Sequence, residues 1–113
     1  MQITVVETAA YLSIASKIMS LGEMESVVTV ISNDPASGDV IPGARGLRKL
    51  RVPLQGRGKR GGGRVIYWYH NEGYPAVLLW AFAKNAASDL TVSQRKTLMG
   101  LAETFLDNYG SKS

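Results

Sequence analysis

Arginine and lysine are concentrated in residues 45–64, a stretch that contains no acidic residue. Eight of the chain's 13 basic residues lie there: Arg45, Arg48, Lys49, Arg51, Arg57, Lys59, Arg60 and Arg64. Guanidinium groups pair with phosphate oxygens, and glycines between them let a ligand approach the backbone closely. The stretch therefore predicts binding to a phosphate-rich partner, of which nucleic acid is the commonest.

The charge of the remaining residues has the opposite sign. Five basic residues remain outside the stretch against nine acidic ones in the whole chain, although the net charge of the protein is +4. A solvated, flexible surface loop is the alternative interpretation of the basic stretch. Solvated surfaces usually mix both signs, however, because like charges at this density repel one another. The absence of acids therefore favours an anionic partner.

The composition limits the chemistry that is open to the chain. There is no cysteine and a single histidine, which excludes disulfides and cysteine nucleophiles and argues against a metal site, so we predict no metal and no cofactor. Residues 56–61 match G-x-G-x-x-G, but a strand rather than a helix is expected after them, which argues against a dinucleotide site. The N-terminal residues lack the pattern of a secretory signal, and the longest apolar run, residues 76–83, is too short to span a membrane. We therefore predict a cytoplasmic protein.

Hydrophobic periodicity predicts the elements that must position the basic residues. Strands are expected at residues 3–6, 47–52, 64–69 and 74–82, and helices at 8–20, 23–32 and 89–109, with a connecting loop over 36–43. The order β-α-α-β-β-β-α predicts one small α+β domain over residues 1–113. Its antiparallel sheet would consist of a three-strand meander plus the N-terminal strand, with helices packed on it.

Aromatic and acidic residues beside the basic strands are further candidates. Tyr67 and Tyr69 should share one face of their strand, with Trp68 in the core on the other. We count Tyr67 among the nucleic-acid-binding residues, because a tyrosine beside a basic strand can stack on a base. His70 is expected to be an ordinary turn residue, and Asp89 to cap or begin the last helix.

Three segments together resemble the RelE/HigB toxins of type II toxin–antitoxin systems, in particular the HigB subgroup. They are Gly46-Leu-Arg-Lys-Leu-Arg51, then Gly58-Lys-Arg-Gly-Gly-Gly-Arg-Val-Ile-Tyr-Trp-Tyr69, and Leu79-Trp-Ala-Phe-Ala-Lys-Asn85 followed by Asp89-Leu-Thr91. The likeness extends over most of the chain, from the first helices to the last. It implies a RelE-like fold, a ribosome-dependent endoribonuclease that inhibits translation, and silencing by a cognate helix-turn-helix antitoxin.

The resemblance also implies a reaction and a site. The mRNA's own 2′-OH would attack the adjacent phosphate without a metal, and Lys49, Arg51, Arg64 and Lys84 match the family's basic catalytic positions. Arg45, Arg48, Arg57, Lys59, Arg60 and Tyr67 are expected to bind the nucleic acid, and Arg60 could join the catalytic group. Residues 88–93 offer no tyrosine or histidine, so Lys84 or Lys49 as a neutral amine is the candidate general base.

Two other functions fit the same residues. A relative could keep the fold and block a different target, as the ParE toxins inhibit gyrase. The meander could also act as a basic β-ribbon that binds nucleic acid without cleaving it. Cleavage requires the Lys49, Arg51, Arg64 and Lys84 set, whereas blocking of a protein target does not.

Overall fold

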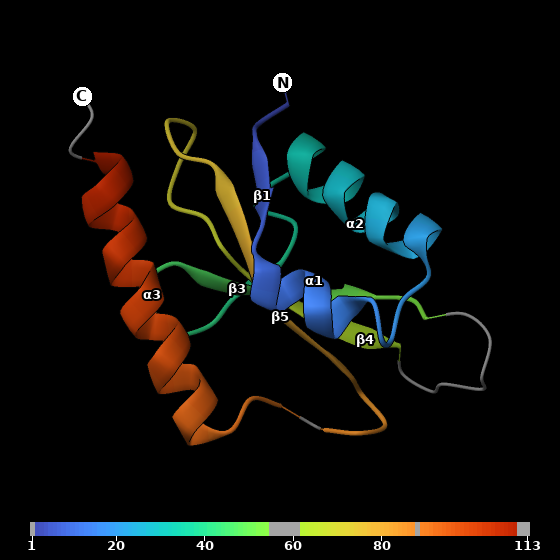
Figure 1. The fold of residues 1–113 in the computed structure, drawn as a ribbon. Coiled ribbons are helices and arrows are strands. Elements are labelled where there is room, and N and C mark those ends of the chain that lie inside the picture. Colours follow the sequence, from blue (N-terminus) through green and yellow to red (C-terminus); the bar gives the residue numbers. More distant parts are fainter. Residues whose placement is uncertain (1, 55–61, 88, 111–113) are drawn as a thin grey trace.

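The computed structural model describes residues 2–54, 62–87 and 89–110, and it has the expected α+β architecture (Figure 1). The elements are β1 (Val5–Glu7), α1 (Ala9–Ala15), α2 (Leu21–Asn33), β2 (Asp39–Val40), β3 (Leu47–Val52), β4 (Gly63–Trp68), β5 (Ala76–Ala83) and α3 (Val92–Gly110). In the part of the chain that is described, no helix is long and apolar enough to cross a membrane.

The five strands form one sheet in the order β1-β5-β4-β3-β2. The antiparallel meander of β3, β4 and β5 confirms the prediction, but β1 joins its edge parallel to β5, so the sheet is mixed rather than antiparallel throughout. The segment that was predicted as a loop contains the short strand β2, in which Asp39 and Val40 pair with Lys49 and Arg48. This correction concerns two exposed residues without strand-like alternation, so the sequence carried no signal for it.

Local hydrogen bonds explain where the first two helices begin and end. The Thr8 side chain caps α1 by accepting a hydrogen bond from the Tyr11 amide, and α1 ends at Ala15, earlier than predicted. Helix α2 starts at Leu21 rather than Glu23, because the Ser20 side chain and the Glu23 carboxylate form a reciprocal capping box. The predicted boundary therefore fell within the first turn of α2.

Helices cover both faces of the sheet, and each face has its own hydrophobic core. Helices α1 and α2 pack on one face over Leu50, Val65 and Leu78. Helix α3 packs on the other face, where Leu98 and Ala102 join Leu47, Ile66 and Trp68 in the second core. In Figure 1, α3 stands on the opposite side of the sheet from α2. The two faces are called the α1/α2 face and the α3 face below.

Tyr67 lies on the α1/α2 face and is completely buried, so its predicted role in binding nucleic acid is wrong. Its hydroxyl donates a hydrogen bond to the carbonyl of Pro35 at 2.7 Å and accepts one from the amide of Gly38 at 2.9 Å. A Cβ at Gly38 would lie 2.8 Å from the Tyr67 ring, which explains the glycine. Tyr67 therefore fixes the chain between α2 and β2 to the core.

Two buried tyrosines should respond differently to loss of the hydroxyl. Tyr67→Phe removes two hydrogen bonds and leaves buried partners unpaired, so we expect a loss of about 1–3 kcal/mol in the free energy of unfolding. Tyr11 is also fully buried, but its hydroxyl has no hydrogen-bond partner among the described residues. Burial, with a smaller contribution from Glu7, raises the pKa of Tyr11 to about 12.

Tyr11→Phe is the matched control for this prediction, because it removes the same atom from a site where that atom makes no hydrogen bond. We expect it to leave stability unchanged or to raise it. Urea unfolding followed by circular dichroism measures both variants. Equal losses for Tyr67→Phe and Tyr11→Phe would contradict the structural role given to the Tyr67 hydroxyl.

Candidate nucleic-acid interface

Three of the four predicted catalytic residues lie on the α3 face of the sheet. Side chains alternate along a strand, so Lys49 and Arg51 of β3 share a face with Leu47, which belongs to the core under α3. Arg64 of β4 is placed there in the same way, because Ile66 and Trp68 belong to that core. The sheet register then puts Arg51 directly opposite Arg64.

The pairing of Arg51 with Arg64 places two positive charges opposite each other on neighbouring strands. Directly opposed residues of antiparallel strands have Cβ atoms about 4.5–5.5 Å apart, and like charges at that distance are destabilising. Arg51 is exposed and Arg64 is half-buried, with its Nη1 donating to the carbonyl of Gly63 at 2.9 Å. An anion between the two guanidinium groups would relieve the repulsion, and a phosphate fits both forks.

Lys49 lies next along the same face and is joined to the segment before α3. Its Nζ is 3.2 Å from Oδ1 of Asp89, and the exposed fractions of the two side chains are 31% and 59%. The pKa of Asp89 is lowered, chiefly by the hydrogen bond from the amide of Leu90 and further by Lys49 and Lys84, against the opposing effect of desolvation. Lys84, the fourth predicted catalytic residue, directly follows β5, and its amide donates to the carbonyl of Gly62 just before β4 at 2.9 Å.

Asp89 itself does not cap α3, contrary to the prediction. The cap is Thr91, whose hydroxyl accepts a hydrogen bond from the Gln94 amide at 3.0 Å, while the Gln94 side chain accepts one from the Thr91 amide at 2.9 Å. This reciprocal pair places the helix start at Val92. Asp89 lies two residues before the cap, where its carboxylate faces the cationic residues of the sheet.

Arg45 and Arg48 occupy different positions from this group. Arg45 has a left-handed backbone conformation with φ 58° and forms a 2.8 Å ion pair with Glu103 of α3. Arg48 alternates onto the α1/α2 face, where Nη1 donates to the carbonyls of Ala36 at 3.3 Å and Gly38 at 2.8 Å. The structure therefore separates Arg48 from Lys49 and Arg51, and its visible role is to hold the segment before β2.

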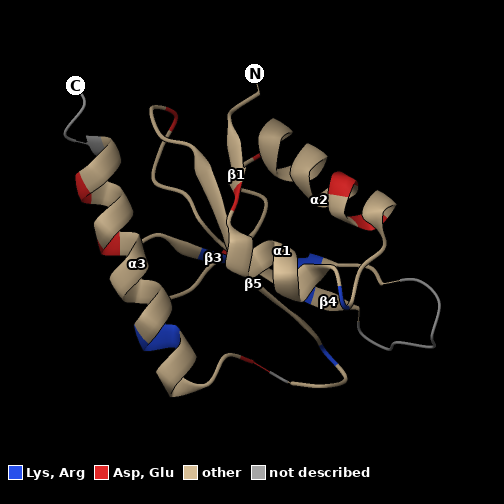
Figure 2. Ribbon diagram, viewed as in Figure 1, with Lys and Arg blue, Asp and Glu red and all other residues tan. Residues whose placement is uncertain are grey.

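Arg57, Lys59 and Arg60 lie outside the described residues. Among the acids that are described, Figure 2 shows several on α2 and on the upper part of α3. His70 is exposed at the other end of β4 from Arg64, and its ring stacks on Trp68 and contacts Tyr74 edge-on. Its position agrees with the prediction of an ordinary residue at a strand end.

Trp80 and Phe82 are the aromatic residues beside the cations, and sequence reasoning did not select them. Both are partly buried and pack against the core of the α3 face, and Phe82 lies opposite Arg64 in the register. A register shift between β4 and β5 at Ile66/Tyr67 changes which residues of β5 share a face. The sequence signal that could have identified them is the alternation of large and small side chains in Trp80, Ala81, Phe82 and Ala83. We name Lys49, Arg51, Arg64, Lys84 and Phe82 the cationic site.

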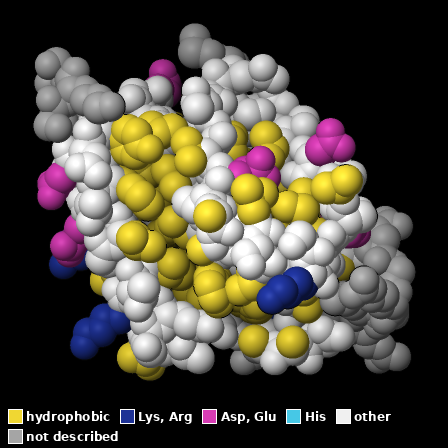
Figure 3. Space-filling view, in the orientation of Figure 1, with side chains coloured by type: hydrophobic (Ala, Val, Ile, Leu, Met, Phe, Trp, Pro, Cys, Tyr) yellow, Lys and Arg dark blue, Asp and Glu magenta, His cyan; other side chains and the backbone are white. Residues whose placement is uncertain are grey.

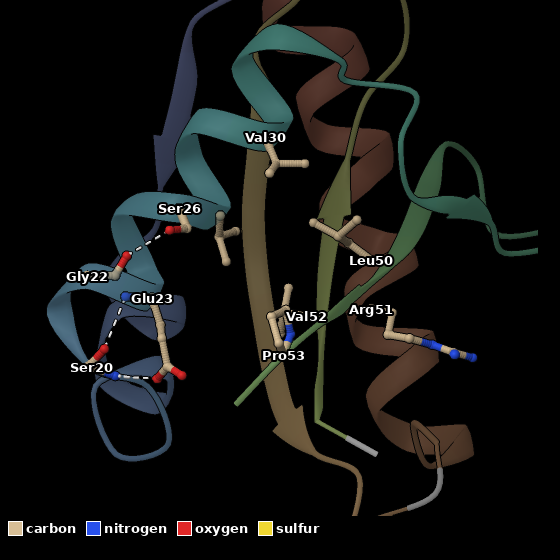
Figure 4. Close-up of a pocket in the computed structure, with 10 residues that line it drawn as sticks. Ser20, Gly22, Glu23, Ser26, Val30, Leu50, Arg51, Val52 and Pro53 are labelled. Carbon is tan, nitrogen blue, oxygen red and sulfur yellow. Dashed lines mark hydrogen bonds between the residues drawn. The ribbon is translucent and has the colours of Figure 1, made fainter. Parts of the chain in front are cut away.

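Grooves lie on both faces of the sheet. A small one of about 190 Å³ adjoins the cationic site and is lined by Asp39, Lys49, Asp89, Leu90 and Arg95 among others. On the α1/α2 face, a groove of about 650 Å³ runs between α2 and β3. Figure 4 shows Val30 and Leu50 facing this second groove, whereas Arg51 extends away from α2. Figure 3 shows a further strip of hydrophobic side chains between α3 and the centre of the molecule.

Apart from Arg51, which lines one side of it, the groove between α2 and β3 has few groups that could bind a phosphate. Its Glu23 carboxylate and Ser20 hydroxyl are engaged in the capping box of α2, and the Ser26 hydroxyl donates to the carbonyl of Gly22.

The described residues contain no cluster of three or more His, Cys, Asp or Glu side chains able to hold a metal ion. The sequence matches no protein-family model.

Proposed function

We propose that this protein is a ribosome-dependent endoribonuclease of the RelE/HigB type, the toxin of a type II toxin–antitoxin pair, which cleaves mRNA and so inhibits translation. The observation that carries the proposal is the direct opposition of Arg51 and Arg64, with Lys49 on the same face. Phe82, opposite Arg64 on the neighbouring strand, adds an apolar ring against which a base can stack. The motif resemblance of the sequence supplies the choice of mRNA as substrate.

In the proposed reaction the 2′-oxygen of a nucleotide attacks the phosphorus atom of the following phosphodiester. The bond from phosphorus to the 5′-oxygen breaks, giving a 2′,3′-cyclic phosphate on one fragment and a 5′-hydroxyl on the other. The 2′-hydroxyl loses one proton and the departing 5′-oxygen gains one, so no external reactant is consumed. Arg51 and Arg64 would stabilise the charge that builds on the non-bridging phosphate oxygens, and Lys49 and Lys84 would add to that field.

The protein's partners follow from the same proposal. mRNA on the ribosome is the substrate, and the inhibitor is a cognate helix-turn-helix antitoxin. Such an inhibitor should carry acidic residues over the cationic site, because a desolvated guanidinium pair without a counter-charge would be costly. The proposed site of action is the cytoplasm, where translating ribosomes are found.

A gyrase-blocking toxin on the same fold is the second candidate, and pulse labelling after induced expression separates the two. An endoribonuclease of this type should stop incorporation of labelled methionine within minutes while incorporation of thymidine continues. A gyrase inhibitor should reduce thymidine incorporation first. A protein that only binds nucleic acid should leave mRNA intact, and uncut mRNA in the induced cells would refute the proposed activity.

A further inference from the structure

The carboxylate of Asp89 lies beside the cationic site, in contact with Lys49. This group comes from the segment between β5 and α3, far in the sequence from the strand that carries Lys49. Oδ1 of Asp89 is 3.2 Å from Nζ of Lys49 and accepts a hydrogen bond from the amide of Leu90 at 2.8 Å. One carboxylate oxygen thus has both an ammonium group and a backbone N–H as donors, as a phosphate oxygen would have.

The segment that carries Asp89 is fixed to the rest of the domain by further contacts. The Thr91 and Gln94 cap holds the start of α3, and Nη2 of Arg95 donates to the carbonyl of Pro42 in the loop after β2. Asp39 of β2 is the register partner of Lys49 and is exposed. Lys49 is therefore flanked by Asp39 on the neighbouring strand and Asp89 on the fixed segment.

The ion pair is placed where it can exchange with a ligand. Both side chains are partly accessible, and ion pairs in contact with solvent are weak because water and salt screen them. A phosphate that approaches Arg51 and Arg64 meets Lys49 on the same face, two residues along β3. Its charge would compete directly with the Asp89 carboxylate for the lysine.

We propose that Asp89 is an internal counter-ion that occupies Lys49 while the site is empty and is displaced by a backbone phosphate of the bound RNA. The carboxylate thereby lowers the affinity of the cationic site for RNA and keeps Lys49 in position until a phosphate arrives. This inference deepens the proposed function and rests on it. It gives Asp89 an autoinhibitory and positioning role rather than a part in bond cleavage.

The test is the salt dependence of binding by Asp89→Asn. Asparagine keeps an oxygen that can accept the hydrogen bond from Leu90 but removes the charge. The probe is a fluorescent single-stranded RNA oligonucleotide with 2′-O-methyl nucleotides throughout, which has no free 2′-hydroxyl to attack the phosphate. At low salt we expect about two- to five-fold tighter binding than wild type. In wild type, the Asp89 carboxylate that RNA displaces from Lys49 takes up a cation from solution, which offsets part of the cation release. Asp89→Asn has no such carboxylate, so the slope of log affinity against log salt should steepen by up to about 0.7.

Glu25→Gln is the matched control, because it removes one negative charge from the exposed surface of α2, on the α1/α2 face. It should leave the salt slope unchanged. If wild type binds the probe and Asp89→Asn binds equally or more weakly while keeping its melting temperature, the counter-ion role is overturned and the proposed function stands. If wild type itself fails to bind the probe at low salt, both proposals fall.

Discussion

Arg64→Ala is expected to abolish most of the cleavage activity while the fold remains intact. The guanidinium group would contact the phosphate oxygens on which charge accumulates, and loss of such a contact costs about 10²- to 10³-fold in rate, or about 2.7–4 kcal/mol. Stability should stay the same or rise by less than about 1 kcal/mol, because the substitution also removes a like-charged neighbour of Arg51. Single-turnover cleavage on programmed ribosomes and a thermal melt measure the two quantities.

Two further variants make this result specific. Arg64→Lys keeps the charge but loses the fork, so it should retain only part of the activity. Lys17→Ala removes an exposed basic residue that follows α1, outside the cationic site, and should cleave normally. If Arg64→Ala cleaves as fast as Lys17→Ala, Arg64 does not belong to the catalytic site.

Trp68→Ala is expected to have the largest effect on stability, a loss of about 3–5 kcal/mol in the free energy of unfolding. The Trp68 side chain is 1% exposed and is the anchor of α3 on the sheet. Its ring lies 5.6 Å from Phe105 and 6.3 Å from Tyr109 of α3, and 5.7 Å from Tyr74 before β5, measured between ring centroids. The loss would be a large share of the 5–15 kcal/mol that is typical of a domain.

Trp80→Ala provides the comparison, because Trp80 packs against the same core but is only partly buried. We expect a smaller loss of stability from it. Chemical unfolding of both variants, followed by far-ultraviolet circular dichroism, gives the two free energies. Equal losses would mean that the contact between Trp68 and α3 contributes little, and the docking of α3 would then need another explanation.

Local patterns predicted the strands of the meander well. Strand β3 has the predicted bounds, and alternation along it placed Lys49 and Arg51 on one face. The two-residue strand β2 could not be found, because its existence depends on pairing with β3 rather than on its own side chains. Tyr67 was misassigned because alternation tells which residues share a face, but not that helices cover both faces of the sheet.

The composition of the cationic site depended on long-range register. The opposition of Arg51 and Arg64 follows from how β3 and β4 align across the residues between them, and no local pattern specifies that alignment. The register shift between β4 and β5 likewise decided that Phe82 lies opposite Arg64. Asp89 was expected at a helix cap. An aspartate can cap a helix or pair with a lysine, and only its tertiary contacts decide which of the two it does.

Mapping of the RNA ends formed on the ribosome tests the central claim most directly. Purified protein is incubated with ribosomes programmed with a defined mRNA, and the fragments are analysed by primer extension and by phosphorylation of their 5′ ends. We predict cuts that require both protein and ribosome, with 2′,3′-cyclic phosphates upstream and 5′-hydroxyls downstream that a kinase labels without prior dephosphorylation. Intact mRNA at saturating protein, or fragments that carry 5′-phosphates, would contradict cleavage by the 2′-hydroxyl at the cationic site.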